Sequence, residues 1–250
     1  MTDPLRRPDS PLPQPGRLER AFLRLVMKQA RLANVEFLAE NFRLITLESP
    51  EFKDVHWRPG QKVQIAMGSA FTARTFTPID WDPLAGRARI LAFMHGSEPG
   101  PAGHWLRQAK AGDECAVFGP RASLDIQPCT GTRVLLGDET SIGLAYALAS
   151  QFPNNAFRCL LEVNRTPGLG EVLRRLNPGD AELFQRMDNE AHLHEIETRL
   201  HELATAGTEF ILTGKAGSIQ RQRQVLKSLG IPASCILTKA YWAPGKTGLD

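Results

Sequence analysis

The chain has 250 residues, of which 42% are hydrophobic and 23% charged. This composition is typical of a folded globular protein and excludes an intrinsically disordered one. The 30 basic and 27 acidic residues leave a net charge of +3, too small an excess to indicate nucleic acid as a partner. The length allows two modest domains, each with its own core.

Cysteine spacing and hydropathy exclude further classes. The four cysteines, Cys115, Cys129, Cys159 and Cys235, are far apart and show neither zinc nor iron-sulfur spacing, so we expect reduced core thiols. No run approaches ~20 uninterrupted apolar residues, and the first residues lack the apolar core of a signal peptide. We therefore expect a cytoplasmic protein without membrane insertion, with a monomer as the default state.

The first half of the chain has the pattern of an antiparallel β-barrel. Residues 1–16 contain five prolines and are expected to form a flexible tail. Residues 18–32 show helical spacing among basic side chains, which predicts a helix that caps the first domain, with contact to an acidic partner or membrane surface as the alternative. Short strands separated by Pro and Gly turns follow at residues 35–38, 42–47, 62–67, 73–79, 88–94 and 114–118. We assign this barrel domain to residues 17–126.

The second half alternates strands with helices. Strands are expected at residues 134–136, 159–163, 210–212 and 235–237, and helices after Ser141 and over residues 190–204 and 219–229. A strand-helix-strand order implies parallel crossovers. We therefore predict an open α/β domain over residues 127–250, with ligands beyond the carboxyl ends of its strands.

One stretch in the first half, residues 74–78, combines a cation, an aromatic ring and a hydroxyl. Alternation along a strand places Arg74 and Phe76 on one side and Thr77 on the other. Phe76 can cover a flat ring, Arg74 can bind a pyrophosphate, and Thr77 can hydrogen-bond a ring edge. We interpret the stretch as a candidate cofactor site, with an ordinary amphipathic strand as the alternative.

A second candidate site is the glycine- and proline-rich run at residues 98–105. It leads into a helix expected over residues 103–111, whose first NH groups form a natural anion site. A pyrophosphate fits there, and an ordinary helix start after a hairpin is the alternative. The histidines His192, His194 and His201 lie on different faces or two turns apart, so no metal site is expected.

The ordered set of motifs resembles the siderophore-interacting proteins, a flavin-dependent ferric-siderophore reductase branch of the ferredoxin-NADP reductase superfamily. The resemblance covers residues 33–245. Its motifs lie at residues 74–77, 95–96, 100–105, 112–113, 119–120, 137–140 and 241–242. It implies an FAD-binding barrel followed by an NAD(P)H-binding α/β domain.

The resemblance also implies site residues. FAD would be held by Arg74, Phe76, Thr77, His95, Gly96, Ala102, Gly103 and Trp105, with Thr77 as the catalytic residue that orients the flavin. NADPH, or NADH, would be bound by Asp138, Glu139, Thr140, Arg165 and Lys215. For the Asp138 turn the alternative is a capped strand-to-helix turn, and for Arg165 a solvated loop arginine.

The chain departs from the family pattern at the face that would receive the substrate. Gln64 stands where a lysine is expected, and Ala243 stands where an arginine often follows Tyr-Trp. Lys215 replaces an acidic residue. The candidate cations for an anionic ferric siderophore are Lys62, Arg121, Lys239 and Lys246.

The implied function is FAD-dependent reduction of a ferric siderophore in iron acquisition, with NAD(P)H as electron donor. One alternative is a general NAD(P)H-dependent flavin oxidoreductase that exchanges electrons with a protein partner such as ferredoxin. Another is a non-catalytic carrier of flavin or siderophore. The absence of the expected cations at Gln64 and Ala243 slightly favours the general reductase.

Overall fold

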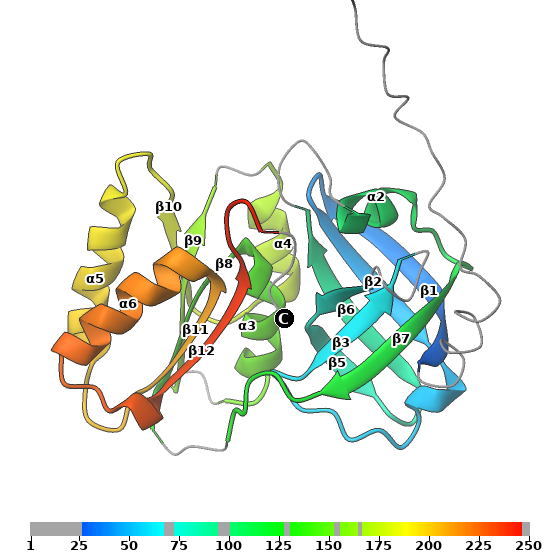
Figure 1. Cartoon of the computed structure of the whole chain (residues 1–250), viewed down its shortest axis with the longest axis horizontal. Helices are drawn as coiled ribbons and strands as arrows, with labels where there is room; N and C mark the ends of the chain where they lie inside the picture. The colour runs from blue at the N-terminus through cyan, green and yellow to red at the C-terminus, as the bar shows by residue number, and fades with distance from the viewer. Residues whose placement is uncertain are drawn as a thin grey trace, which may run out of the picture.

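Two β-sheets organise the protein, as the computed structural model shows (Figure 1). It describes residues 27–67, 73–94, 101–127, 131–152, 156–164 and 167–246. The first sheet has seven antiparallel strands and the second has five parallel strands. The expected boundary between residues 126 and 127 falls between the two sheets, and the proline-rich segment 1–16 lies outside the described residues.

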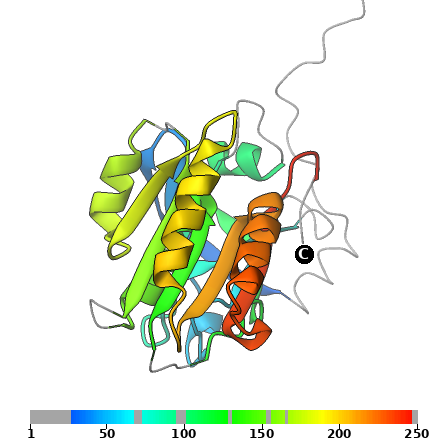
Figure 2. The ribbon, with the colours of Figure 1, turned by 90° about the vertical axis from the view of Figure 1, so that its left-hand side faces the viewer.

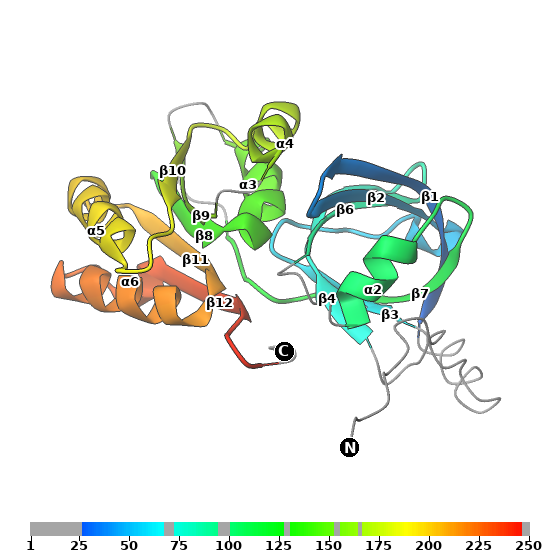
Figure 3. The same ribbon diagram turned by 90° about the horizontal axis from the view of Figure 1, so that it is seen from above.

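The antiparallel sheet is curled into a barrel. Its strands are β1 (Lys28–Ala39), β2 (Phe42–Glu48), β3 (Lys62–Ala66), β4 (Ala73–Phe76), β5 (Pro78–Asp82), β6 (Arg87–Phe93) and β7 (Glu114–Arg121). The strand order is β4-β3-β7-β1-β2-β6-β5, so β4 and β5 form opposite edges. Only Thr77 separates these two strands in the chain, so the sheet must curl until its edges meet at this residue. Figure 3 shows the curled sheet from above. We call this meeting point at Thr77 the barrel seam.

Alternating side chains fill the barrel. In β3, buried Val63 and Ile65 alternate with half-buried neighbours, as expected for a strand with one face in a core. The helix α2 (Pro101–Gln108) contributes Leu106 to the same core, and the short 3-10 helix η1 (Pro50–Phe52) contributes Phe52. The predicted antiparallel barrel is therefore confirmed.

Two expectations for this domain need correction. Residues 28–32 belong to β1 and not to a helix, because Lys28 to Arg31 pair with β7 and the buried Ala30 and Leu32 alternate with exposed Arg31. Residues 18–26 of the expected helix lie outside the described residues. The expected strand at 73–79 is two strands, β4 and β5, interrupted at Thr77.

The second sheet has the order β10-β9-β8-β11-β12. Its strands are β8 (Arg133–Asp138), β9 (Phe157–Val163), β10 (Ala181–Gln185), β11 (Glu209–Lys215) and β12 (Ile236–Trp242). The four strands expected from the sequence are present and parallel, as predicted. Edge strand β10 was not predicted, because only Phe184 in it is buried and it therefore carries no apolar run.

Helices cover both faces of the parallel sheet. On the barrel side lie α3 (Ile142–Ala149) and α4 (Leu169–Leu176), and on the outer side lie α5 (Ala191–Leu203) and α6 (Ala216–Ser228) (Figures 2 and 3). The 3-10 helices η2 (Glu139–Ser141) and η3 (Ala233–Cys235) precede α3 and β12. The short helix α4 was not predicted. Among the described residues, no helix has the length and apolar character needed to cross a membrane.

The barrel and the parallel sheet share one hydrophobic cluster. Phe42 and Ile79 of the barrel belong to it together with Leu144 and Leu148 of α3. Gly143 lies so close to β5 that a Cβ atom there would be 2.8 Å from Cγ2 of Ile79. Helix α3 therefore packs directly on the barrel and fixes the position of one domain against the other.

The cysteines are thiols in the described part of the chain. Cys115 and Cys159 are buried and Cys235 is half-buried, while Cys129 lies outside the described residues. Burial raises the pKa of Cys115 to about 12 and also raises the pKa of Cys159. These two thiols are therefore expected to be unreactive core residues.

Candidate functional site

The barrel seam lies against the second domain. The side chain of Thr77 shares a hydrogen bond with the hydroxyl of Tyr241, near the end of β12. Burial raises the pKa of Tyr241 to about 12, and the hydrogen bond from Thr77 opposes this shift. The end of β12 approaches the barrel in Figure 3. The predicted catalytic residue therefore lies where the two domains meet.

Two of the residues predicted to bind FAD, Arg74 and Phe76, lie on the same side of β4, and a third, Trp105, lies on α2. Arg74 and Phe76 are paired with the core residues Ile65 and Val63 of β3, and paired residues of antiparallel strands point to the same face. The ring of Phe76 lies 6.4 Å from that of Trp105 on α2, at 43°. The structure therefore brings the ring of Trp105 close to the side of β4 on which Arg74 and Phe76 lie.

The remaining predicted FAD residues belong to α2 or fall outside the described residues. Half-buried Ala102 and buried Gly103 precede Trp105 on α2, whereas His95 and Gly96 are not described. The guanidinium of Arg74 donates to the carbonyl of Ala73 at 2.9 Å. No carboxylate among the described residues forms an ion pair with Arg74. Its charge thus fits the binding of a pyrophosphate.

The turn after β8 is closed by its own side chains. The Thr140 backbone NH donates to Oδ1 of Asp138 at 2.9 Å, and the Asp138 NH donates to Oγ of Ser141 at 3.3 Å. Asp138 and Glu139 are each only 1% exposed. A phosphate at this turn would have to displace Asp138 and approach two carboxylates. The geometry matches the capped turn that was the alternative in the sequence analysis.

Two carboxylates from this turn and one from β9 surround an arginine that sequence analysis missed. Arg186 lies 3.0 Å from Glu139 (Nη1 to Oε2), 3.6 Å from Asp138 (Nη2 to Oδ2) and 3.5 Å from Glu162 (Nε to Oε2). We call Asp138, Glu139, Glu162 and Arg186 the carboxylate cluster. It lies at the carboxyl edge of the parallel sheet, where α/β proteins bind ligands.

Two further side chains contact this cluster through Glu162. The Nε2 atom of His192 lies 3.5 Å from Oε2 of Glu162, and Nε2 of Gln222 donates to Oε1 at 3.3 Å. His192 was considered only as a metal ligand in the sequence analysis. No group of three or more metal-binding side chains occurs in the described part of the chain. The signal that was available is Glu162 itself, an acid that follows the buried residues Cys159, Leu160 and Leu161 in β9.

Trp242 connects the cluster to the barrel seam. Its indole Nε1 donates to Oδ2 of Asp138 at 2.7 Å, and its neighbour Tyr241 contacts Thr77. Lys215 is half-buried and lies beside Trp242 in the strand register. Arg165, the other predicted phosphate contact, lies outside the described residues.

The residues predicted to bind substrate fall into two places. Lys62 and Arg121 face each other across β3 and β7, and Arg121 Nη2 donates to Oε1 of Gln64 at 2.6 Å. Lys62 and Gln64 alternate with the buried residues of β3, so they point to the outer face of the barrel. Lys239 is half-buried and Lys246 exposed, both in the second domain. The structure therefore places Lys62 opposite Arg121 on the barrel, whereas Lys239 and Lys246 belong to the second domain.

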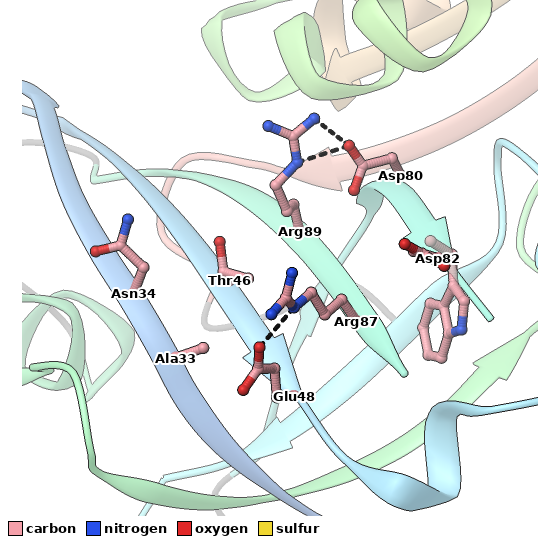
Figure 4. Close-up of a pocket in the computed structure, with 9 residues that line it drawn as sticks. Ala33, Asn34, Thr46, Glu48, Asp80, Asp82, Arg87 and Arg89 are labelled. Atoms are coloured by element: carbon pink, nitrogen blue, oxygen red, sulfur yellow. Dashed lines mark hydrogen bonds and ion pairs between the residues drawn. The ribbon is translucent and has the colours of Figure 1, made fainter. Parts of the chain in front are cut away.

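A hollow of about 670 Å³ lies elsewhere on the barrel, over β1, β2, β5 and β6 (Figure 4). Its arginines are already paired, Arg87 with Glu48 and Arg89 with Asp80. Arg89 also donates to the hydroxyl of Tyr146 on α3. The lining includes none of the predicted site residues. These interactions connect β2, β5 and β6 of the barrel with one another and with α3, so we assign the hollow a structural role.

Comparison with known proteins is consistent with this geometry. Residues 17–124 match the model of the siderophore-interacting FAD-binding domain. The siderophore-interacting protein SipS of Aeromonas hydrophila has a similar structure, with 21% identity, 89% of this chain and 93% of that chain covered, and a TM-score of 0.73. The siderophore-interacting protein of Acinetobacter baumannii is 14% identical, with 88% and 92% covered and a TM-score of 0.71.

A third structure extends the likeness to another branch of the fold. The flavohaem-like FAD/NAD-binding domain of nitric oxide dioxygenase from Vibrio cholerae is 16% identical, with 87% of this chain and 99% of that chain covered, and a TM-score of 0.65. At such identities the similarity establishes the fold. The chain has the two-domain fold of ferredoxin-NADP reductase-like proteins.

Proposed function

Because residues 17–124 match the model of the siderophore-interacting FAD-binding domain, we propose that the chain is an FAD-dependent ferric-siderophore reductase. NAD(P)H is the electron donor in this proposal, and an Fe(III) chelate is the acceptor. Iron arrives and leaves as substrate, so the protein needs no metal ligands of its own.

The observation that carries the proposal is the contact between Thr77 and Tyr241. It places the barrel seam beside the carboxyl edge of the parallel sheet. A flavin whose edge binds Thr77 would have the barrel on one side and the second domain on the other. A donor on the second domain and an acceptor in solution can then both reach it.

The residues around the seam fit FAD. Arg74 offers a permanent cation to the pyrophosphate, and the rings of Phe76 and Trp105 offer flat apolar surface to the ring system. FAD, when bound, supplies the chemistry that joins two-electron oxidation of NAD(P)H to one-electron reduction of Fe(III). The role of Thr77 is to orient the flavin through its hydroxyl or its backbone NH.

The donor is expected at the carboxyl edge of the parallel sheet. The capped turn at Asp138 to Thr140 disfavours phosphate, so these residues would lie near the uncharged part of the donor. The phosphates are assigned to Lys215, the last residue of β11, and to Arg165, which follows β9 in the sequence and lies outside the described residues. Whether NADPH or NADH is preferred depends on these two residues.

The proposed acceptor is an anionic chelate, mainly because Arg121 provides a positive charge on the barrel. Its guanidinium donates to Gln64 and therefore supplies a positive charge at the position where a lysine was expected. Lys62 lies opposite it. Lys239 and Lys246 would add positive charge from the second domain. Attraction of this kind favours negatively charged siderophores over neutral ones.

The test is an anaerobic reduction with the purified, FAD-loaded protein. NADPH or NADH should bleach the flavin absorbance, and a ferric siderophore should restore it with a stoichiometry of two Fe(III) per NAD(P)H, because a hydride carries two electrons. Ferrous iron is detected with a ferrous-specific chelator. If the flavin is bleached but no ferric chelate restores its absorbance, the substrate part of the proposal is wrong.

The same experiment decides between the proposal and its alternatives. Reoxidation by ferredoxin but not by ferric chelates would indicate a general reductase, an outcome that Ala243 at the position of an expected arginine would explain. A protein that binds FAD but is bleached by neither nucleotide would be a carrier. A protein that binds no FAD would contradict every flavin-based assignment.

A further inference from the structure

The carboxylate cluster contains more negative than positive charge. Asp138, Glu139 and Glu162 are 1%, 1% and 2% exposed, and the arginine among them is Arg186. Within the cluster, His192 and Gln222 contact Glu162. Buried carboxylates are tolerated when a cation and hydrogen bonds compensate for their lost hydration. Arg186 is the cation that is close to all three.

Each carboxylate is also bound by a donor from a different part of the domain. Glu139 accepts the backbone NH of Asn164 at 2.6 Å, and Glu162 accepts the amide of Gln222. Asp138 accepts Trp242 Nε1 at 2.7 Å. The cluster therefore connects the ends of β8, β9 and β12 through charge-assisted hydrogen bonds, whose strength depends on ionised carboxylates.

The bond between Asp138 and Trp242 requires a close approach of the chain. A Cβ atom on Gly214 would lie 2.4 Å from Oδ2 of Asp138, the oxygen that binds the indole. The guanidinium carbon of Arg186 also lies 5.9 Å from the centroid of the Trp242 ring. Arg186 thus contacts both partners of the hydrogen bond that holds the end of β12.

The end of β12 is the part of the second domain that touches the barrel seam, because Tyr241 hydrogen-bonds Thr77. Arg186 therefore contacts Asp138, and Asp138 contacts Trp242. Tyr241, which precedes Trp242 in the chain, contacts Thr77. Each step is a hydrogen bond, an ion pair or a peptide bond. These contacts link the side chain of Arg186, in the loop after β10, to Tyr241 at the seam.

We propose that Arg186 is a positioning residue, which acts through Asp138 and Trp242 to hold Tyr241 against Thr77. The part of this inference that concerns catalysis rests on the proposed function. Without the arginine, three buried carboxylates lose their shared cation and repel one another. This repulsion weakens the hydrogen bond from Trp242 to Asp138. Tyr241 then leaves its place beside the flavin-binding edge.

The direct test is fluorine NMR of protein labelled with fluorotryptophan, with and without FAD. The chain has four tryptophans, and Trp242→Phe identifies the resonance of Trp242. Arg186→Met should shift and broaden that resonance and leave the other three unchanged. Arg186→Lys, which keeps the charge, should restore most of the original shift. An unchanged Trp242 resonance in Arg186→Met would overturn the inference.

A matched control separates positioning from general destabilisation. Arg158 on β9 forms an ion pair with Asp180 at the other end of the parallel sheet, so Arg158→Met removes an arginine of the same domain without touching the cluster. Thermal unfolding of both variants is measured in parallel. If Arg158→Met changes the Trp242 resonance as much as Arg186→Met does, the effect is a general loosening and the inference is wrong.

The consequence for the flavin is measured with FAD-loaded protein. Aromatic side chains close to a flavin quench its fluorescence, so Arg186→Met should increase the fluorescence and Arg158→Met should not. The rate of flavin reduction by NADPH should fall about ten- to a hundredfold, as when a reacting group is misplaced by ~1 Å. If wild-type protein is not reduced by either nucleotide, the proposed function fails, while the NMR result still decides whether Arg186 positions Trp242.

Discussion

Thr77 and Tyr241 come from different sheets, yet their side chains share a hydrogen bond at the barrel seam. Thr77 is the single residue between the two edge strands of the barrel, and Tyr241 belongs to the last strand of the parallel sheet. The contact joins the edge of the predicted flavin site to the edge of the predicted nucleotide site. Its disruption should therefore change both stability and catalysis.

The first prediction concerns pH. Burial raises the pKa of Tyr241 from 10 to about 12, and tyrosine is neutral when protonated, so the folded state keeps the proton to higher pH than the unfolded state. The contribution to stability is fully present below pH 10 and is lost as the pH rises through 12. Between about pH 9 and about pH 11 the free energy of unfolding should fall by roughly 1 kcal/mol through this group.

Urea unfolding at these two pH values checks this prediction with Tyr241→Phe as the control. The variant has no phenol at this position, so its loss of stability on going to high pH should be smaller by the same amount. Equal losses in wild type and variant would show that Tyr241 is not protected from ionisation.

The second prediction concerns FAD binding by Arg74. Arg74→Met keeps the length of the side chain but removes the charge offered to the pyrophosphate. A hydrogen bond to a charged group contributes about 1.5 to 3 kcal/mol, so affinity for FAD should fall about ten- to a hundredfold. Titration of apoprotein with FAD, followed by flavin fluorescence, measures this change. Arg87→Met, on the outer face and paired with Glu48, should bind FAD as wild type does.

The third prediction concerns Gly214, whose φ is +94°. A Cβ atom there would adopt a strained backbone conformation and would lie 2.4 Å from Asp138. Gly214→Ala should therefore lower the free energy of unfolding by roughly 2 kcal/mol. Gly217→Ala, three residues along the chain where a Cβ meets nothing within 4 Å, is the control and should not be destabilised. Equal stability of the two variants would contradict the crowding at Asp138.

The fourth prediction is an asymmetry in the ion pair between Arg133 and Glu209. Arg133 is 1% exposed and Glu209 is 31% exposed. Glu209→Gln leaves a buried charge without its partner and should cost about 3 kcal/mol of stability. Arg133→Met leaves a carboxylate that water can still reach and should cost about 1 kcal/mol. Chemical unfolding of both variants measures the difference, and the reverse order would contradict the burial argument.

The fifth prediction concerns substrate charge at Arg121. Arg121→Met removes the guanidinium that binds Gln64 and should raise the KM for an anionic ferric chelate by about tenfold or less. Reduction of a cationic acceptor such as hexaammineruthenium(III) should be unchanged or faster. Steady-state assays at low and high salt check this, because screening should reduce the difference. An equal effect on both acceptors would indicate that Arg121 supports the fold and not substrate binding.

Local patterns were sufficient to predict much of the fold. Alternation of apolar residues predicted the barrel strands, and the change to strand-helix alternation after residue 133 predicted the parallel sheet. Patterns failed where the signal was short or misleading. Strand β10 has a single buried residue, Phe184, and the helical spacing of residues 18–32 continued into a segment that pairs with β7 as a strand.

The same limit applies to the candidate site. The sequence by itself determined that Arg74, Phe76 and Thr77 form one short motif, because strand alternation decides the side on which each residue lies. Only the tertiary structure decided what surrounds that motif. It brings Thr77 to Tyr241 and Arg186 to Asp138. Curling of the antiparallel sheet and side-by-side pairing of the parallel strands create these contacts, and residues so far apart along the chain show no periodic pattern that would predict them.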